Sequence, residues 1–192
     1  EAYRTAGLEP AVRRESERQF DPDGGITAVE SLAGREIACY IPNLNEGVAE
    51  FSPTKRLFMT QQSLEPLLKE GAEASGAMLH YATELVSFEQ DALGVTALVR
   101  DVDTGQTARI RARYLIAADG NRSPIREKLG IRMRGHGLLS KSVTIYFRAD
   151  CSRWLADRNL GVIYVLNADL RGFFRMVREG TSGFLVVNTV GD

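Results

Sequence analysis

The chain has 192 residues, of which 44% are hydrophobic and 26% are charged. This balance is typical of folded globular proteins and argues against a disordered chain. The 24 basic residues nearly cancel the 25 acidic ones, so no strong field is expected to draw the chain to nucleic acid or anionic lipid. The length allows one good core or parts of two domains.

Metal and membrane sites are not expected. Cys39 and Cys151 lie far apart, as do His80 and His136, and a zinc site needs three or four clustered ligands. The chain shows neither a basic leader followed by an apolar segment nor an apolar run of membrane-spanning length. We therefore expect a reduced, cytoplasmic protein without a metal ion or a membrane partner.

The first 60 residues are predicted to form a helix end and a pair of strands. Gly7 is expected to end the helix, and the arginine- and glutamate-rich residues 13–20 are expected to form a charged loop. Residues 21–25 (DPDGG) predict a turn. Residues 26–30 and 36–41 then predict two strands around Ala33 and Gly34.

A helix is predicted over residues 64–75, because Leu64, Leu67 and Leu68 recur at helical spacing. Pro66 would lie in its first turn and Gly76 would end it.

Short strands are predicted next, at residues 77–81, 84–88, 94–102 and 108–113. The last two are joined by a hairpin turn at 103–105 (DTG). The continuous apolar run 114–118 (YLIAA) predicts a strand that is covered on both faces. A short helix should follow, with Ser123 as N-cap, Pro124 at the first position and Gly130 at the end.

From residue 138 onward, alternation predicts antiparallel sheet, with strands at 143–147, 162–166, 172–178 and 184–189 and helical turns within 152–158. The order of elements predicts an α/β chain, or α+β overall. A partial Rossmann-like cofactor domain with a β-meander would join an antiparallel substrate sheet. We assign residues 1–137 to the first domain, with 21–58 as an excursion into the substrate sheet, and 138–192 to the second.

The segment 114–131 (YLIAADGNRSPIREKLGI) carries the clearest chemical signal. A buried strand would deliver Asp119 to the carboxyl end of a sheet, where ligands of open α/β sheets collect. Asp119 could accept hydrogen bonds from hydroxyls, Gly120 would permit a tight turn, and the following helix could offer N–H groups to phosphate. A strand followed by an Asp-Gly turn and a capped helix is also a common structural arrangement. The chemistry alone therefore leaves open whether this segment binds a ligand or is only structural.

The spacing of DGxxSxxRxxLGI strongly resembles the second flavin motif of the para-hydroxybenzoate hydroxylase family, the class A flavoprotein monooxygenases. A second segment, with Gln61, Glu65 and Leu68, is similar to the family's Gln-x-x-x-Glu-x-x-Leu helix, and residues 84–120 resemble its β-meander. Within the family, ESLAGREIACYIPN and SPTKRLFMTQQSLEPLL are similar to the polyketide branch that includes aklavinone hydroxylases. The resemblance covers residues 1 to about 140 and fades beyond 150.

The resemblance implies FAD and NADPH as cofactors and hydroxylation of an aromatic ring, polyketide or phenol, through a flavin hydroperoxide, with the cofactor supplying the chemistry. Gln61 would reach the ribityl–pyrophosphate region, Leu85 would present backbone groups to the adenine, and Asp119 with Gly120 would lie near the nucleotide. Simpler roles remain open: Gln61 as a helix cap, Leu85 as core, and Arg126 in a surface ion pair. No side chain is required as a catalytic nucleophile.

The substrate wall is expected in the second half of the chain. The candidate residues are Tyr146, Phe147, Tyr164 and Phe174, although aromatic residues are also ordinary in a sheet core. The family's GxGxxG and Gly-Asp segments have no match here, so other segments of a parent enzyme are expected as partners and the isolated chain is expected to bind FAD poorly. A non-catalytic remnant that binds an aromatic ligand is the alternative. The LGI ending argues against a halogenase or a prenyl reductase.

Overall fold

The computed structural model describes residues 2–155, 158 and 160–189. They form mixed α and β structure, which confirms the predicted fold class. The elements, in chain order, are α1 (Ala2–Thr5), α2 (Glu9–Gln19), β1 (Gly25–Val29), β2 (Glu36–Ile41), α3 (Val48–Phe51), α4 (Gln61–Ala74), β3 (Thr83–Asp91), β4 (Gly94–Asp101), β5 (Thr107–Ala112), α5 (Pro124–Lys128), β6 (Lys141–Arg148), α6 (Ser152–Leu155), β7 (Leu160–Leu166), β8 (Arg171–Met176) and β9 (Ser182–Thr189).

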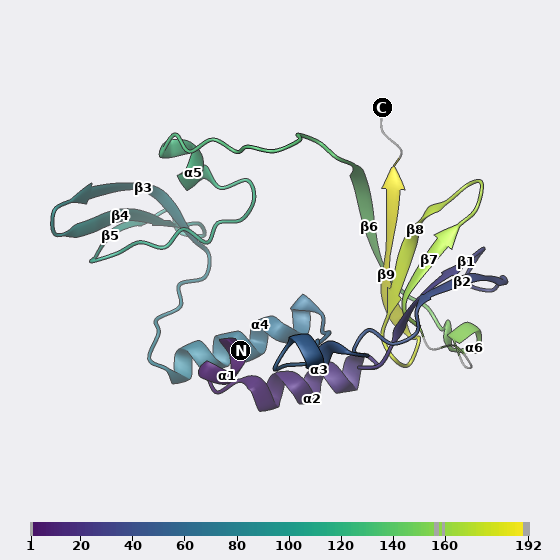
Figure 1. The fold of residues 1–192 in the computed structure, drawn as a ribbon. Coiled ribbons are helices and arrows are strands. Elements are labelled where there is room, and N and C mark those ends of the chain that lie inside the picture. Colours follow the sequence, from purple (N-terminus) through teal and green to yellow (C-terminus); the bar gives the residue numbers. More distant parts are fainter. Residues whose placement is uncertain (1, 156–157, 159, 190–192) are drawn as a thin grey trace. The chain divides into compact units, whose positions relative to one another are not determined.

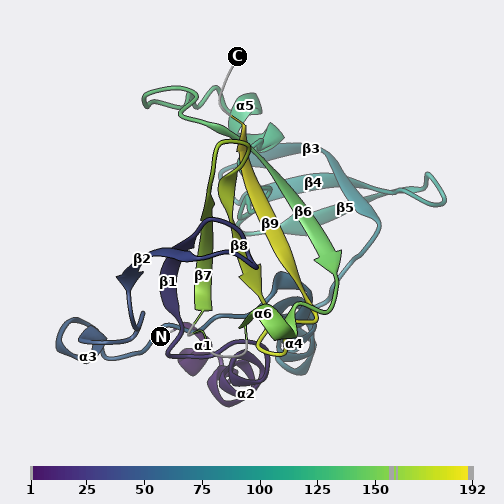
Figure 2. The ribbon, with the colours of Figure 1, turned by 90° about the vertical axis from the view of Figure 1, so that its right-hand side faces the viewer.

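The chain divides into two compact units, of which the first joins Glu1–Gly76 to Leu138–Asp192 and the second is Ala77–Gly137. The first unit contains a six-stranded sheet in the order β2-β1-β7-β8-β9-β6 (Figures 1 and 2). The second contains the three-stranded meander β3-β4-β5 and the helix α5 (Figure 1).

All neighbouring strands of the six-stranded sheet are antiparallel except β1 and β7, which run parallel. Segments far apart in sequence therefore share one sheet, because β1 lies between β2 and β7. The core on one face of this sheet is built around Val29, Ile163 and Val165, with Phe174 packed against them. Successive residues of a strand point to opposite faces, so the alternation that predicted these strands also defines the two faces.

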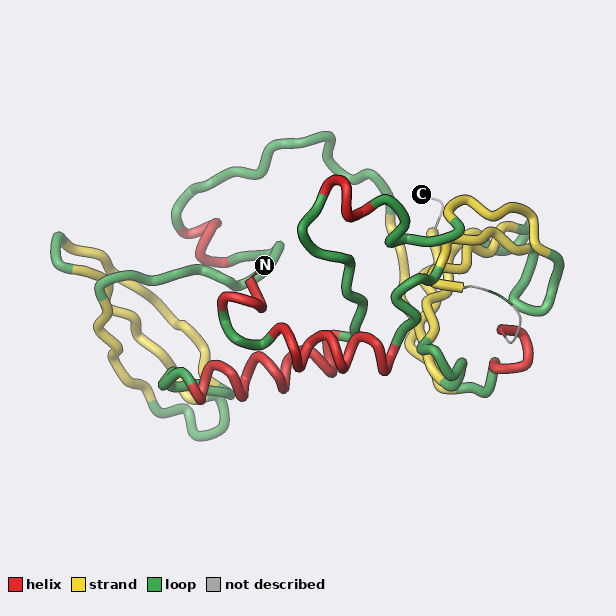
Figure 3. The backbone as a smooth tube through the Cα atoms, turned by 60° about the horizontal axis from the view of Figure 1, so that its bottom comes forward, coloured by secondary structure: helices red, strands yellow, loops and turns green. Residues whose placement is uncertain are grey.

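The helix α2 corrects the predicted charged loop at residues 13–20. Arg13 pairs with Glu9 at 2.7 Å and Arg18 with Glu15 at 2.6 Å, at helical spacing. Its buried side is formed by Val12, together with two polar residues discussed below. α2 lies beside α4 (Figure 3).

Two predicted strands are wrong. Residues 77–81 form no strand and are exposed, and residues 114–118 form no strand pairing. Tyr114 is 82% exposed and Ile116 87% exposed, so the apolar run has no covering layer among the described residues. Local hydrophobicity predicted a strand there, but a strand needs partners on its edges.

The remaining elements differ from the predictions at their ends. α4 begins at Gln61 rather than at residue 64, so Pro66 lies one turn inside the helix. α5 has the predicted cap, with the Arg126 N–H donating to Ser123 Oγ at 3.0 Å. The predicted turns in 152–158 are α6, although residues 156 and 157 lie outside the described part. Among the described residues, no helix is long and apolar enough to cross a membrane, and no three side chains are grouped as metal ligands.

Candidate cofactor and substrate site

The four predicted cofactor residues lie on different units. Gln61 belongs to the first unit, whereas Leu85, Asp119 and Gly120 belong to the second. Gln61 is exposed in the first turn of α4, where its Nε2 donates to Glu65 Oε1 at 2.6 Å. It does not cap the helix, because the capping position is Thr60.

Asp119 precedes α5 in sequence and helps to cap its N-terminus. Its Oδ2 accepts the Ile125 N–H at 3.2 Å. The Ser123 hydroxyl is the largest influence that lowers the pKa of Asp119, and the Ile125 N–H adds to it. The carboxylate is therefore ionised at neutral pH. Because Ser123 and Asp119 already accept N–H groups of the first turn of α5, that turn has fewer donors for phosphate than the sequence suggested.

Two backbone features of the second unit fit a nucleotide cofactor. Gly120 has φ +83°, and a Cβ added to it would meet no heavy atom within 4 Å, so the turn is open to a bound group. Leu85 lies in β3, an edge strand of the meander, and such a strand has backbone N–H and C=O groups directed away from its neighbour. Beside them, Lys128 on α5 lies over the Phe88 ring, 4.5 Å from its centroid, and donates to the Phe88 carbonyl.

The predicted substrate residues lie on both faces of the six-stranded sheet. Tyr146 contacts Phe184, with ring centroids 5.7 Å apart. Phe184 also contacts Phe173, and Phe173 contacts Tyr164. Strands β6, β9, β8 and β7 therefore carry one row of rings on one face of the sheet. Phe147 and Phe174 contact each other at 5.9 Å, and the strand alternation places them on the opposite face. One flat wall therefore contains Tyr146 and Tyr164 but not Phe174.

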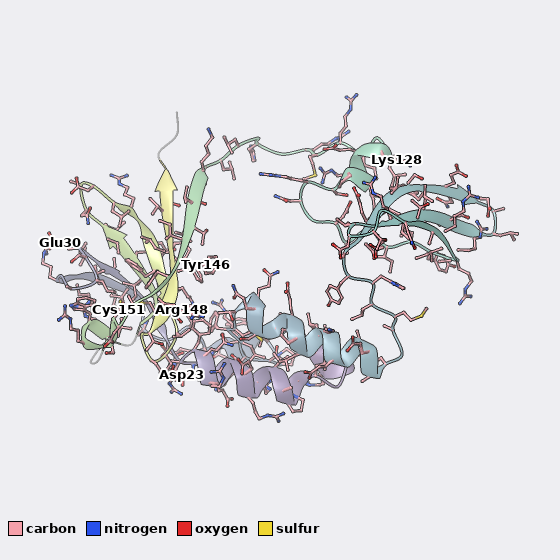
Figure 4. The ribbon with its side chains drawn as sticks, turned by 180° about the vertical axis from the view of Figure 1, so that it is seen from behind. Asp23, Glu30, Lys128, Tyr146, Arg148 and Cys151 are labelled. Carbon is pink, nitrogen blue, oxygen red and sulfur yellow. The ribbon has the colours of Figure 1, made fainter. Side chains whose placement is uncertain are left out.

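A cavity of about 630 Å³ borders the Tyr146 side of this row, within the range of small-molecule sites. Figure 4 shows Tyr146 and Arg148 on β6, the edge strand at the cavity. The lining includes Phe147 and Phe184 but neither Tyr164 nor Phe174. The remaining walls come from the end of α2, the start of α4 and the turn between β8 and β9.

Buried polar side chains of α2 hold these walls together. Ser16 and Gln19 are each 5% exposed. The Phe58 N–H donates to Ser16 Oγ at 3.0 Å, and the Thr60 N–H donates to Gln19 Oε1 at 3.0 Å. The Arg178 N–H donates to the Gln19 carbonyl at 2.7 Å. Helix α2 thus fixes both the segment that leads into α4 and the turn that follows β8.

Sequence reasoning missed one residue of this cavity above all. Arg175 borders the cavity from β8 and is 8% exposed. The available signal was alternation: Phe173 and Arg175 are two residues apart in a strand, so a cation was placed on an otherwise aromatic face. The contacts with Phe20 and Phe58 had no such signal, because they depend on the fold of α2.

A family model described as an FAD binding domain matches residues 1–190. A 4-methyl-5-nitrocatechol 5-monooxygenase of a Burkholderia species is 58% identical over the whole chain and 35% of its own length. An aklavinone 12-hydroxylase of Streptomyces peucetius is 35% identical over 91% of the chain and 36% of its own length.

Solved structures show the same fold. The flavin-dependent monooxygenase PieE, in complex with FAD and substrate, matches with a TM-score of 0.84 at 28% identity, over 99% of this chain and 35% of that one. An aklavinone-11 hydroxylase with FAD and aklavinone matches with a TM-score of 0.78 at 29% identity, over 95% and 35%. The chain spans about a third of the length of these relatives. It belongs to the FAD-binding-domain family, whose matched relatives are flavin monooxygenases and aromatic hydroxylases.

Proposed function

We propose that this chain is part of an FAD-dependent, NAD(P)H-using monooxygenase that hydroxylates an aromatic polyketide or phenol. The observation that carries the proposal is the row of rings from Tyr164 to Tyr146, which leads to a cavity of small-molecule size. The family match and the names of the relatives support it. The free Cys39 and Cys151 support the cytoplasmic location that we propose with it.

Bound FAD would supply the redox and oxygen chemistry, so the residues of this chain bind and orient. We assign Gln61, Leu85, Asp119 and Gly120 to the cofactor. The exposed amide of Gln61, the edge backbone of Leu85 and the open turn at Gly120 support these roles. Asp119 remains ionised and can accept hydrogen bonds from ribose or ribityl hydroxyls on the lone pairs that α5 does not use.

On the substrate side, we propose that Tyr146 contacts the aromatic ring directly, since it borders the cavity. Tyr164 extends the same row of rings. Phe147 also borders the cavity, but its ring contacts Phe174 on the opposite face of the sheet, so we propose that these two rings support the wall from behind. Stacked or edge-on rings orient a flat ligand without needing a charged catalytic group. We assign no catalytic side chain within this chain.

The alternative is a non-catalytic protein that binds an aromatic ligand. One observation favours it: the cavity and the row of rings lie within a single compact unit, so ring binding requires none of the proposed cofactor residues on the meander unit. The two functions differ in flavin dependence, and an experiment can separate them.

A chimera tests the proposal. Residues 1–192 would replace the matching third of the Burkholderia monooxygenase, whose sequence is 58% identical. We expect the purified chimera to retain FAD and to consume oxygen and NAD(P)H when 4-methyl-5-nitrocatechol is added. Asp119→Asn keeps most of the cap and removes the charge, so it separates the cofactor role from the stability of α5; it should lower flavin retention. Asp103→Ala changes an exposed aspartate of a turn in the same unit and serves as the control.

A folded chimera that holds FAD but consumes no oxygen would favour the non-catalytic alternative. Flavin content and turnover that are unchanged in Asp119→Asn would refute the role of Asp119. A flavin titration of the 192-residue chain alone completes the test, and we expect weak binding because the proposed cofactor residues form only part of a nucleotide site.

A further inference from the structure

The proposed cofactor residues of the second unit lie on two segments whose spacing the backbone alone does not fix. Leu85 lies on β3, whereas Asp119 and Gly120 lie in the turn before α5. Residues 114–118, which lead into this turn, form no strand pairing. A helix as short as α5 is also not stable by itself. A nucleotide that contacts both segments therefore depends on a further contact that holds them together.

The turn and α5 are joined by local hydrogen bonds. The Ile125 N–H donates to Asp119 Oδ2 at 3.2 Å, and the Arg126 guanidinium donates to the Asn121 carbonyl at 2.8 Å. Both bonds connect a residue of the turn to a residue of the helix. The position of α5 therefore sets the position of Gly120.

Lys128 joins α5 to β3 across 40 positions of sequence. It is the last residue of α5 (Figure 4), and its Nζ lies 4.5 Å from the centroid of the Phe88 ring. The same Nζ donates to the Phe88 carbonyl at 3.3 Å. A cation is attracted to the face of an aromatic ring, and the carbonyl fixes the direction in which the ammonium group points.

This contact lies next to an irregularity in β3, the edge strand of the meander. The pairing of β3 with β4 shifts between Leu85 and Ser87, so Val86 has no partner on β4. Such bulges redirect backbone groups and are frequent beside binding sites. Phe88 follows the bulge directly after Ser87, so Lys128 contacts β3 close to the position that we assign to the adenine.

We propose that Lys128 is a positioning residue for the cofactor, which holds α5 against β3 so that the Gly120 turn and the Leu85 edge contact one nucleotide. Lys128 acts through Phe88 and does not itself contact the cofactor. The inference deepens the proposed function and rests on it for the identity of the ligand. The contact between Lys128 and Phe88 can be measured without flavin.

Flavin titration of the chimera, freed of FAD, tests the proposal. Loss of the contact should lower the fraction of molecules in which both segments are in place, and the apparent Kd for FAD rises as that fraction falls. Because a ring contact and a hydrogen bond at an exposed site are each modest, we expect Lys128→Met to weaken FAD binding about 3- to 10-fold. At saturating FAD, the rate of NAD(P)H oxidation should stay within about twofold of the wild type.

Matched variants separate positioning from charge. Lys128→Arg should restore the affinity to within about twofold, because a guanidinium also stacks on a ring and donates to a carbonyl. Lys55→Met removes the same charge from an exposed position of the other unit and should leave the affinity unchanged. Phe88→Leu should weaken FAD binding as well, and Lys128→Met should then have a smaller effect, because the ring is already absent.

NMR of the 192-residue chain measures the contact itself. The ε-methylene protons of Lys128 should be shifted upfield by the Phe88 ring, and Phe88→Leu should abolish this shift. Unshifted protons in the wild type would show that the contact does not form, and this would overturn the proposal whatever the flavin affinity.

Two results with the chimera would also overturn the proposal. An affinity of Lys128→Met within about twofold of the wild type would show that the contact does not position the site. A loss of the same size in the Phe88→Leu background would show that Lys128 binds the cofactor directly. If the wild-type chimera held no FAD, the proposed function would fail and the role of Lys128 with it. Failure of the Lys128 role alone requires a wild type that binds FAD, so the two failures are distinguishable.

Discussion

Replacement of Gln19 by leucine should weaken the contact between α2 and the segment that leads into α4. Gln19 is 5% exposed, and its Oε1 accepts the N–H of Thr60, the residue that precedes α4, at 3.0 Å. Its Nε2 also donates to Glu15 at 2.5 Å. Leucine fills nearly the same volume but can accept or donate no hydrogen bond, so the substitution removes both bonds while leaving the packing almost intact.

The magnitude follows from these two bonds. A buried donor left without a partner costs about 1–3 kcal/mol, and a typical hydrogen bond contributes about 1 kcal/mol. Burial of the added apolar surface offsets about 1 kcal/mol. We expect the free energy of unfolding of the first unit to fall by about 2 kcal/mol. At a slope of about 1–3 kcal/mol per molar urea, the midpoint should move by roughly 1 M.

Urea unfolding followed by tryptophan fluorescence measures this effect, since Trp154 is the chain's single tryptophan and lies in the first unit. Gln62→Leu, at an exposed position of α4, is the matched control and should change the free energy by less than about 0.5 kcal/mol. If Gln19→Leu unfolded within that same margin of the wild type, the bond to Thr60 would not hold this contact, and the account of how α2 positions the cavity would be wrong.

Three further substitutions probe the same unit. Arg175→Met should raise the melting temperature in a thermal scan, because an apolar side chain of similar length replaces an unpaired buried charge; a lower temperature would contradict this. Gly25→Ala should destabilise by about 1–3 kcal/mol in urea, since the new Cβ would lie 2.5 Å from the Ile41 carbonyl oxygen. Arg4 and Arg13 lower the pKa of Glu9 from 4.5 to about 2, so its contribution is complete above about 4.5 and is lost as the pH falls toward 2. Glu9→Gln should flatten the decline of stability in that window, and an unchanged acid transition would refute the assignment.

Elements with local signals were predictable from the sequence. α5 was predicted from its N-cap Ser123 and from Pro124, and both roles are observed. The β4–β5 turn was predicted from its Asp-Thr-Gly sequence, and Gly105 has φ +71° there. In each case the determining contacts involve residues at most a few positions apart, so the local sequence contains the necessary information.

Elements that depend on distant partners were not predictable. α2 has many charged residues, and its buried face includes Ser16 and Gln19, whose partners lie about 40 positions later. Polar residues on a buried face obscure the apolar period that identifies a helix. The opposite error occurs at 114–118, where the apolar run predicts a buried strand but has no strand partners. In α2, distant residues supply the hydrogen-bond partners of buried polar side chains. At 114–118, no distant strand pairs with the apolar run.

The distinction between local signals and distant contacts also explains which parts of the candidate site were predicted. Aromatic residues in strands indicated a wall of rings, but only the strand register shows that Tyr146 and Phe147 have different partners. Which residues border a common cavity depends on where the end of α2 and the segment before α4 meet the sheet. The roles of Gln61 and Asp119 came from a family resemblance and stay predictions that flavin binding must test.

Arg175 also shows why a functional residue can be recognised by its stability effect. A purely structural arginine would stabilise the fold through its partners, so its loss would lower both the melting temperature and the affinity for any ligand in the cavity. An unpaired buried arginine gives the opposite sign: methionine should raise the melting temperature of the free chain, because the substitution removes a buried charge whose Nη2 has no partner among the described residues. The melting curves of the wild type and of Arg175→Met therefore test with one substitution whether this arginine serves the stability of the fold.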